Sequence, residues 1–267
     1  MLSIVIPAFN EERYIVACLD SIASQTVKPL EVIVVDNNST DRTVEIAGKY
    51  LFVKVMQQKR QHQVFAQATG FNSADGDILG RLDADSILPT DWAEKVVAAF
   101  DNDPKLLAVT GGADPYDVPL KWAGSAIFHG YIYVAGLVGG QRMLWGANSA
   151  LRRSAWQKIK SEVMMRPDIW EDYDMAFCLK KYGKIDYIPD NLVGVSFRAM
   201  HTSFGRHISY QWRSVRTFYH RTNILRTALF TLQWTTTIAI YPLAVFDDWL
   251  LRRREARAKA PEFVSHH

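Results

Sequence analysis

The sequence lacks the glycine-rich loops with which many nucleotide-binding folds hold phosphate. The turn after its first apolar run reads "PAFNEE", residues 7–12, and contains no glycine. A dinucleotide-binding fold needs G-x-G-x-x-G at this place, and a P-loop needs G-x-x-x-x-G-K-[ST]. Both phosphate cradles are therefore excluded, and a bound phosphate would need another counter-charge.

Cysteine and long apolar runs are also scarce. The two cysteines, Cys18 and Cys178, have no C-x-x-C partner, which excludes a disulfide framework and a cysteine zinc site. The start, "MLSIVIPAFN", is too short and uncharged for a signal peptide, and we expect a strand from residue 2. A charge-free stretch near the end of the chain, residues 228–246, is interrupted by Pro242 and four threonines.

The net charge of +3 is unevenly distributed along the chain. From Arg198 to the end there are 11 Lys/Arg and 4 Asp/Glu, whereas residues 1–197 hold 20 and 24. A mildly acidic body with a basic tail favours a tail that meets an anionic surface, with a membrane favoured over nucleic acid. A solvated basic face is the alternative.

The first 115 residues alternate between buried-strand and helical patterns. Apolar runs at residues 2–9, 31–37, 77–85 and 106–112, with a weaker run at 52–58, are separated by helical patterns. This alternation predicts an α/β fold, with a mostly parallel, Rossmann-like central sheet and helices on both faces. We expect a domain over residues 1–200, with halves 1–115 and 116–200, and a basic, helical extension over 201–267.

Four polar clusters follow predicted strands, and ligands bind an open α/β sheet beyond the carboxyl ends of its strands. The fourth strand ends on Asp83 and Asp85. Two carboxylates at a strand's mouth are costly to bury unless something pairs with them. Mn²⁺ or Mg²⁺ binds one or two carboxylates together with phosphate oxygens and water, so a cation is the natural substitute for the missing phosphate loop. The clusters are Asn10–Glu12, Asp36–Asn38, Asp83 with Asp85, and Trp145–Asn148.

Five stretches together resemble the family 2 glycosyltransferases, which have the GT-A fold. They are "IVIPAFNEERYIVACLDSIASQ", "EVIVVDNNSTDRT", "RLDADS", "WGANSALRRSAW" and "WEDYDMAFCLKKYG". The resemblance covers roughly residues 1–195 and implies transfer of a sugar from a nucleotide-diphosphate donor, with inversion at the anomeric carbon and usually with Mn²⁺ or Mg²⁺.

The resemblance also implies roles for individual residues. Asp172 would be the general base, and Glu171 would position the acceptor or share that role. Trp145, Gly146, Asn148 and Glu171 would border the acceptor. Asp85 would be the main metal ligand, with Asp83 at the ribose or metal and His201 as a further metal ligand. The residues implied for the donor are Pro7, Ala8, Asn10, Glu11, Asp36, Asn38, Arg60, Asp83, Ala84 and Asp85.

The chemistry of these residues agrees with the resemblance. An inverting displacement needs one carboxylate to accept the acceptor's proton, while a cation stabilises the departing diphosphate. The sequence departs from the family's pattern at Arg81, where an apolar strand residue is usual, which indicates either an unusual phosphate contact or an exposed edge. It also departs at residues 59–72, where Arg60, His62 or Gln67 would replace a donor contact. The Q-x-x-R-W motif of processive synthases is absent, which favours a single addition.

The tail after residue 201 predicts helices that lie on a membrane or on the protein's own domain. Apolar residues recur at helical spacing from Phe204 to Tyr219, with arginines around them. Arginines flank residues 228–246 on both sides, which disfavours a simple crossing. A helix or hairpin in the cytoplasmic leaflet is the leading interpretation, with a span and a dimer contact as alternatives. A lipid-linked acceptor would fit this placement.

Two other functions are compatible with a metal at a nucleotide-binding sheet. A sugar nucleotidyltransferase would normally need a glycine-rich, arginine-containing loop after the first strand, which "PAFNEE" does not provide. A catalytically inactive GT-A-like module that binds a membrane or partner would not need Asp83, Asp85 and Asp172, all of which are present.

Overall fold

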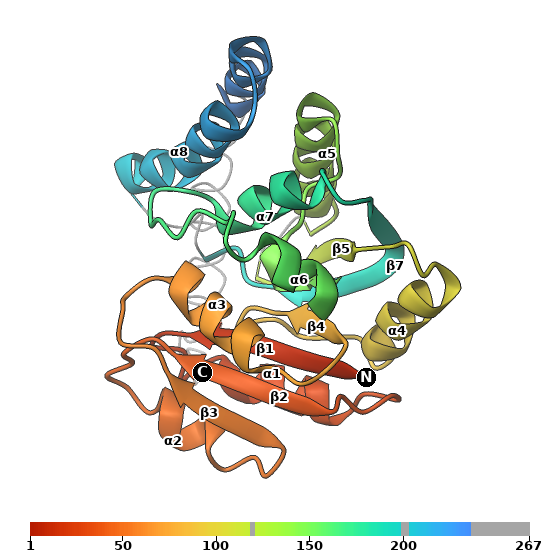
Figure 1. Ribbon diagram of the computed structural model, residues 1–267. Coiled ribbons are helices and arrows are strands. Elements are labelled where there is room, and N and C mark those ends of the chain that lie inside the picture. The colour runs from red at the N-terminus through yellow and green to blue at the C-terminus, as the bar shows by residue number, and fades with distance from the viewer. Residues whose placement is uncertain (118–120, 199–202, 236–267) are drawn as a thin grey trace, which may run out of the picture.

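The computed structural model describes residues 1–117, 121–198 and 203–235, and its core is one twisted sheet (Figure 1). The strand order is β3-β2-β1-β4-β6-β5-β7. β6 runs antiparallel to both of its neighbours, and the other pairs are parallel. The strands are β1 (Leu2–Ala8), β2 (Glu31–Asp36), β3 (Val53–Gln57), β4 (Ile78–Arg81), β5 (Ala108–Pro115), β6 (Ser149–Arg152) and β7 (Ile185–Val195).

The expected mostly parallel α/β sheet with flanking helices is confirmed. β6, from the second half of the predicted domain, inserts between β4 and β5 of the first half, so both halves share one sheet. The helices are α1 (Ile15–Ala23), α2 (Thr43–Ala47), α3 (Gln63–Ser73), α4 (Trp92–Asn102), α5 (Lys121–Gly139), α6 (Arg153–Ile159), α7 (Glu171–Leu179) and α8 (Phe204–Arg221), with a short 3-10 turn, η1 (Gly146–Asn148).

Each apolar strand buries alternate residues on opposite faces of the sheet, because successive side chains of a strand point to opposite sides. Val5 belongs to a core beneath α3, α6, α7 and α8, whereas Ile4 and Ile6 belong to a second core beneath α1 and α4. This two-sided burial explains why the strands read as continuous apolar runs rather than as alternating patterns.

Residues 204–221 and 224–235 are helical, as expected, and the first of these helices docks on the protein's own domain. Val215 and Phe218 of α8 are buried, and Arg221 donates to Asp174 of α7 at 2.5 Å. A second helical segment, residues 224–235, follows a break, and Phe230 stacks on Phe218 with ring centroids 3.8 Å apart. Trp212 and Tyr219, on the predicted apolar stripe of α8, remain exposed.

None of the helices within the described ranges has both the length and the apolarity needed to cross a bilayer. Of the charge-free stretch at 228–246, residues 236–246 lie outside the described part of the chain, so its predicted relation to a membrane stays a prediction. His201, predicted as a metal ligand, also lies outside the described residues.

Candidate active site

The carboxyl ends of β1, β2 and β4 meet at one rim of the sheet and bring the predicted donor residues together. Ala8 at the end of β1 lies opposite Asp36 at the end of β2, and Val5 lies opposite Arg81 at the end of β4. The chain leaves these strands through Asn10, Asn38 and Asp83 at the same rim. The polar clusters expected after these three strands therefore lie along one rim of the sheet.

Several donor residues on this rim are held by local hydrogen bonds. The Asp36 carboxylate accepts from the amide of Ser39 at 3.0 Å, and the Asn10 side chain accepts from the amide of Thr40 at 2.8 Å. Asn38 donates to the carbonyl of Lys59 at 2.9 Å. These bonds tie the loops after β1, β2 and β3 to one another. Pro7 is half-buried beside them, Ala8 and Ala84 are buried, and the exposed Arg60 lies over the ring of Phe65 at 3.8 Å.

Arg81 is completely buried and lies at the centre of the site. Its Nη1 donates to Asp83 Oδ1, and its Nε donates to Gln67 Oε1 at 3.2 Å. Burial alone would lower the pKa of a guanidinium, but the charges of Asp83, Asp172 and Glu171 hold the pKa of Arg81 above its usual value. Arg81 is therefore not an exposed edge residue, and Gln67 supports Arg81 from within the protein.

Asp172, the predicted base, lies in the first turn of α7 and is almost fully buried. Its Oδ2 accepts from the backbone amide of Gly146 at 2.8 Å, and its Oδ1 has no hydrogen-bond partner within the described part of the chain. Burial, reinforced by the neighbouring charge of Glu171, raises the pKa of Asp172 to about 7 even though Arg81 opposes the shift. Burial also raises the pKa of Glu171. An acid with a pKa near neutrality and one free oxygen is suited to proton transfer.

Gly146 separates Arg81 from Asp172 and leaves no room for a side chain. A Cβ at this position would lie 2.6 Å from Asp172 Oδ2 and 2.7 Å from the guanidinium carbon of Arg81. Trp145 beside it is half-buried, with its ring 4.6 Å from that of Phe128 on α5. The glycine is required here because the Asp172 carboxylate approaches the backbone directly.

Asn148, predicted to border the acceptor, lies beneath the site instead. It is 1% exposed, and its amide nitrogen donates to the carbonyls of Gly112 and Asn191 at 3.0 and 2.6 Å. Its oxygen accepts from the indole of Trp92 at 2.8 Å. These bonds within the protein fix η1 below Gly146, and the acceptor contact predicted for Asn148 stays a prediction.

Asp85 lies on the other side of the rim, in a second cluster of charges with Glu11 and Arg198. Arg198 donates to both oxygens of Glu11 at 2.5 and 2.7 Å, and its Nε lies 3.1 Å from Asp85 Oδ2. Burial and the charge of Asp83 raise the pKa of Asp85 to about 7, although Arg198 opposes the shift. Arg198 also lies over the ring of Tyr14 at 4.3 Å.

Sequence reasoning did not identify Arg198 as a member of the site. A signal was present, because Arg198 follows the end of β7 by three residues. β7 is parallel to β5, so its carboxyl end falls near the same rim. The same rule that selected Asp83 and Asp85 would have selected Arg198.

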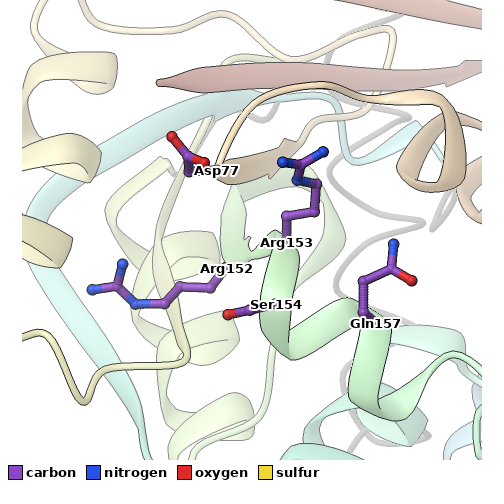
Figure 2. Close-up of a pocket in the computed structure, with 5 residues that line it drawn as sticks. All are labelled: Asp77, Arg152, Arg153, Ser154 and Gln157. Carbon is purple, nitrogen blue, oxygen red and sulfur yellow. The ribbon is translucent and has the colours of Figure 1, made fainter.

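A pocket of about 460 Å³ lies at the opposite end of β4 and is separate from this site (Figure 2). It is lined by Asp77 before β4 and by Arg152, Arg153, Ser154 and Gln157 around the start of α6. Arg152 donates to the carbonyls of Leu106 and Phe100, both at 2.8 Å, and it points away from Arg153. No predicted site residue lines this pocket.

Comparison with known proteins assigns the family. The model of "Glycosyl transferase family 2" matches residues 3–160. The chain belongs to glycosyltransferase family 2. It is 26% identical over 219 residues to EpsH of Bacillus subtilis (strain 168), whose glycosyltransferase assignment is itself provisional; the match covers 78% of this chain and 58% of EpsH. The chain spans less than two thirds of the length of the curated relatives that it matches.

Solved structures support the same GT-A fold. The mannosyltransferase PcManGT from Pyrobaculum calidifontis, in complex with GDP-Man and Mn²⁺, matches with a TM-score of 0.64 and 20% identity, over 97% of this chain and 76% of that one. S. aureus TarS 1-349, in complex with UDP-GlcNAc, matches with a TM-score of 0.57 and 20% identity, over 87% of this chain and 66% of that one. The chain therefore has the GT-A fold.

The residues at the rim fit a divalent cation of the kind predicted. Within the described residues no group of three or more His, Cys, Asp or Glu side chains is arranged to enclose a metal. Mn²⁺ and Mg²⁺ do not need such a cage, because phosphate oxygens and waters complete their coordination around one or two carboxylates. Asp83 and Asp85 would supply these hard oxygen ligands, and a cation there would oppose both the burial and the charge of Asp83 that raise the pKa of Asp85.

Proposed function

We propose that this protein is an inverting glycosyltransferase that requires Mn²⁺ or Mg²⁺ and moves one sugar from a nucleotide-diphosphate donor to an acceptor hydroxyl or phosphate. The observation that supports this proposal most strongly is the geometry of Asp172. Its partner-free oxygen and its pKa of about 7 occur beside Arg81, which also contacts Asp83. A poised base and the predicted metal-binding carboxylates are thus linked through one side chain.

In the proposed reaction the Asp172 carboxylate accepts the proton of the acceptor hydroxyl through its free Oδ1. The acceptor oxygen forms a bond to the anomeric carbon on the face opposite the diphosphate, whose bond to that carbon breaks with both electrons leaving on the diphosphate oxygen. Gly146 holds Asp172 Oδ2 through its amide and thereby aims Oδ1. Asp83 and Asp85 would hold the divalent ion, which would supply positive charge to the departing diphosphate.

The donor assignment is supported by the neighbours, which were crystallised with GDP-Man and Mn²⁺ and with UDP-GlcNAc. Pro7, Ala8, Glu11 and Asp36 lie at or just beyond the carboxyl ends of β1 and β2, where they would line the nucleotide pocket. We also propose that the enzyme acts at the cytoplasmic face of a membrane on a lipid-linked acceptor. The basic tail from Arg198 and the charge-free residues 228–246 support this location.

Two substitutions separate donor binding from transfer. Asp85→Ala should abolish Mn²⁺-dependent binding of nucleotide-sugars, measured as a thermal shift across UDP-, GDP- and dTDP-sugars, because a ligand that binds only the native state stabilises it. Asp172→Asn should retain that shift and lose transfer by about 10²–10⁴-fold, the usual contribution of a general base. Full transfer by Asp172→Asn would disprove the base assignment, and an unchanged shift in Asp85→Ala would disprove the metal site.

A further inference from the structure

Two helices that the sequence separates by about a hundred residues lie side by side at one end of the molecule. Arg226, in the segment 224–235, donates to the carbonyls of Val138 and Gly139 of α5 at 3.1 and 2.8 Å. Seven residues later, Gln233 donates to the carbonyl of Tyr131 at 2.7 Å. The two helices therefore run antiparallel, at the end of the molecule opposite α2 and β3 (Figure 1).

Both helices turn apolar side chains outward. Leu137 on α5 is 62% exposed and Leu232 on the second helix is 69% exposed. Ile127, Val134 and Leu137 are separated by seven and three residues, and Leu225, Leu229 and Leu232 by four and three, which places each set on one helical face; Tyr133 and Ile224 flank these sets. We call these side chains the two-helix apolar face: Ile127, Tyr133, Val134, Leu137, Ile224, Leu225, Leu229 and Leu232. Apolar side chains clustered in this way mark an interaction site, whereas singly scattered ones do not.

Neither helix of this face carries an acidic residue, and two cations lie at one end of it. The sequence has no Asp or Glu between Asp117 and Glu162, and none between Asp190 and Asp247, so neither helix lies in an acidic stretch of chain. At the carboxyl end of α5, Lys180 and Arg226 both donate to the carbonyl of Gly139, at 2.9 and 2.8 Å. Two cations therefore border the end of the face that holds Leu137.

We propose that the two-helix apolar face rests in the interface of an anionic lipid bilayer. Apolar side chains bordered by Lys and Arg are the pattern by which helices lie on such membranes, because acyl chains accept the apolar groups while anionic headgroups attract the cations. A symmetric contact with a second copy would instead bring two surfaces of the same charge together.

This inference extends the membrane location in the proposed function, which depends on residues 204–246, to α5. The position of α5 relates the bilayer to the site. α5 follows β5 at the catalytic rim, and its Phe128 packs on Trp145 beside Gly146, while Tyr116 before it donates to the carbonyl of Asp85 at 3.0 Å. A lipid-linked acceptor would then reach Asp172 from the bilayer, along the side of the site formed by Trp145 and Gly146.

Vesicle binding by variants that carry a glutamate in place of a surface leucine tests the proposal. Leu137→Glu on α5 and Leu229→Glu on the second helix should each weaken co-sedimentation with vesicles of 70% phosphatidylcholine and 30% phosphatidylglycerol by about tenfold, because each removes a buried leucine from the interface. Leu51→Glu is the matched control, since Leu51 is fully exposed between α2 and β3. It should bind as the wild type does, and purely zwitterionic vesicles should bind all of the proteins less.

A fluorescent label reports whether the face enters the lipid. The two native cysteines are buried, so Leu137→Cys and Leu51→Cys can be labelled selectively with an environment-sensitive dye. Emission should shift to shorter wavelength at residue 137 when vesicles are added and should not change at residue 51. The role of α5 would be disproved if Leu137→Glu bound vesicles as the wild type does and the dye at residue 137 showed no emission shift. It would also be disproved if the protein bound no vesicles and formed a concentration-dependent dimer that Leu137→Glu dissociates.

The proposed function and this inference can fail separately. Mn²⁺-dependent donor binding is measured without vesicles and should be unchanged in Leu137→Glu. Suppose that Asp85→Ala loses donor binding while Leu137→Glu binds vesicles as the wild type does. The proposed enzymatic function would then stand, and the membrane contact of the two-helix apolar face would be disproved.

Discussion

Two arginines meet carboxylates on either side of the Asp83–Asp85 pair, in very different surroundings. Arg81 has no exposed surface and lies among Asp83, Asp172 and Glu171, with Gln67 as a neutral partner. Arg198 has a side chain that is 37% exposed and pairs with Glu11 and Asp85. The first arginine is enclosed by the protein, whereas the second can leave its partners for solvent.

This difference indicates different tasks for the same kind of ion pair. A buried charge that loses its partner is strongly destabilising, so Arg81 and the acids around it must remain together throughout the reaction. A partly exposed pair contributes little to stability and can be exchanged. Arg198 therefore serves as a replaceable counter-charge at the place where a divalent ion is proposed to bind.

The largest expected effect concerns Arg81, the buried arginine. Arg81→Gln should lower the free energy of unfolding by about 3–5 kcal/mol, because it leaves Asp172 and Glu171 buried without a counter-charge. Urea unfolding measures the loss. In an Asp172→Asn background the same substitution should cost less, since one of the stranded charges is absent. Equal costs in both backgrounds would show that Arg81 does not act through Asp172.

Sequence reasoning located the rim but could not explain Arg81. Asp83 and Asp85 were predicted because the position of strand ends follows from local apolar patterns. Apart from Asp83, two residues along the chain, the groups that surround Arg81 come from α3 and α7, and such tertiary contacts leave no local pattern in one sequence. Helix α5 was not predicted either, since its four glycines and its β-branched residues are poor helix formers and its stability depends on packing.

A smaller effect on stability is expected from a change of pH, and it arises from Asp172, beside the buried Arg81. The pKa of Asp172 is raised to about 7, so between pH 4 and pH 7 the folded protein retains a proton that the unfolded chain has lost. The free energy of unfolding should therefore fall as the pH rises through this window, by up to about 4 kcal/mol for a shift of about three pKa units, and should level off above it. Thermal or urea unfolding in EDTA measures the profile.

Asp172→Asn provides the control for this profile, because asparagine does not titrate. Its unfolding free energy should depend less on pH than that of the wild type, with the difference confined to pH 4–7. An identical profile in the two proteins would show that the carboxyl of Asp172 keeps its ordinary pKa.

A still smaller effect is expected from Gly146, which lies between Arg81 and Asp172 and was predicted to border the acceptor. Gly146→Ala would place a methyl group 2.6 Å from Asp172 Oδ2, so the carboxylate must move away from the backbone amide. Transfer should fall by about tenfold to a hundredfold, the cost of misplacing a catalytic group by roughly 1 Å. Donor binding should change little. Gly205→Ala, on the solvent side of α8 where no atom lies within 4 Å of the new Cβ, is the matched control for steady-state kinetics.

The smallest expected effect concerns Arg198, the partly exposed arginine, and is measured as metal affinity in the absence of donor. Arg198→Gln removes the cation that pairs with Glu11 and Asp85, so Mn²⁺ should bind about fivefold more tightly, as expected for two mutually exclusive cations with modest coupling. Titration calorimetry measures the affinity at pH 8 and above, because the pKa of Asp85, about 7 beside Arg198, would rise further in the variant and protons would then compete with Mn²⁺ near neutral pH. The free energy of unfolding should change by less than about 1 kcal/mol, in contrast to Arg81→Gln.

Arg142→Gln, at an exposed pair with Asp186, is the control and should leave Mn²⁺ affinity unchanged. Weaker Mn²⁺ binding in Arg198→Gln would mean that Arg198 orients Asp85 for the ion, and the two arginines would then share one structural task.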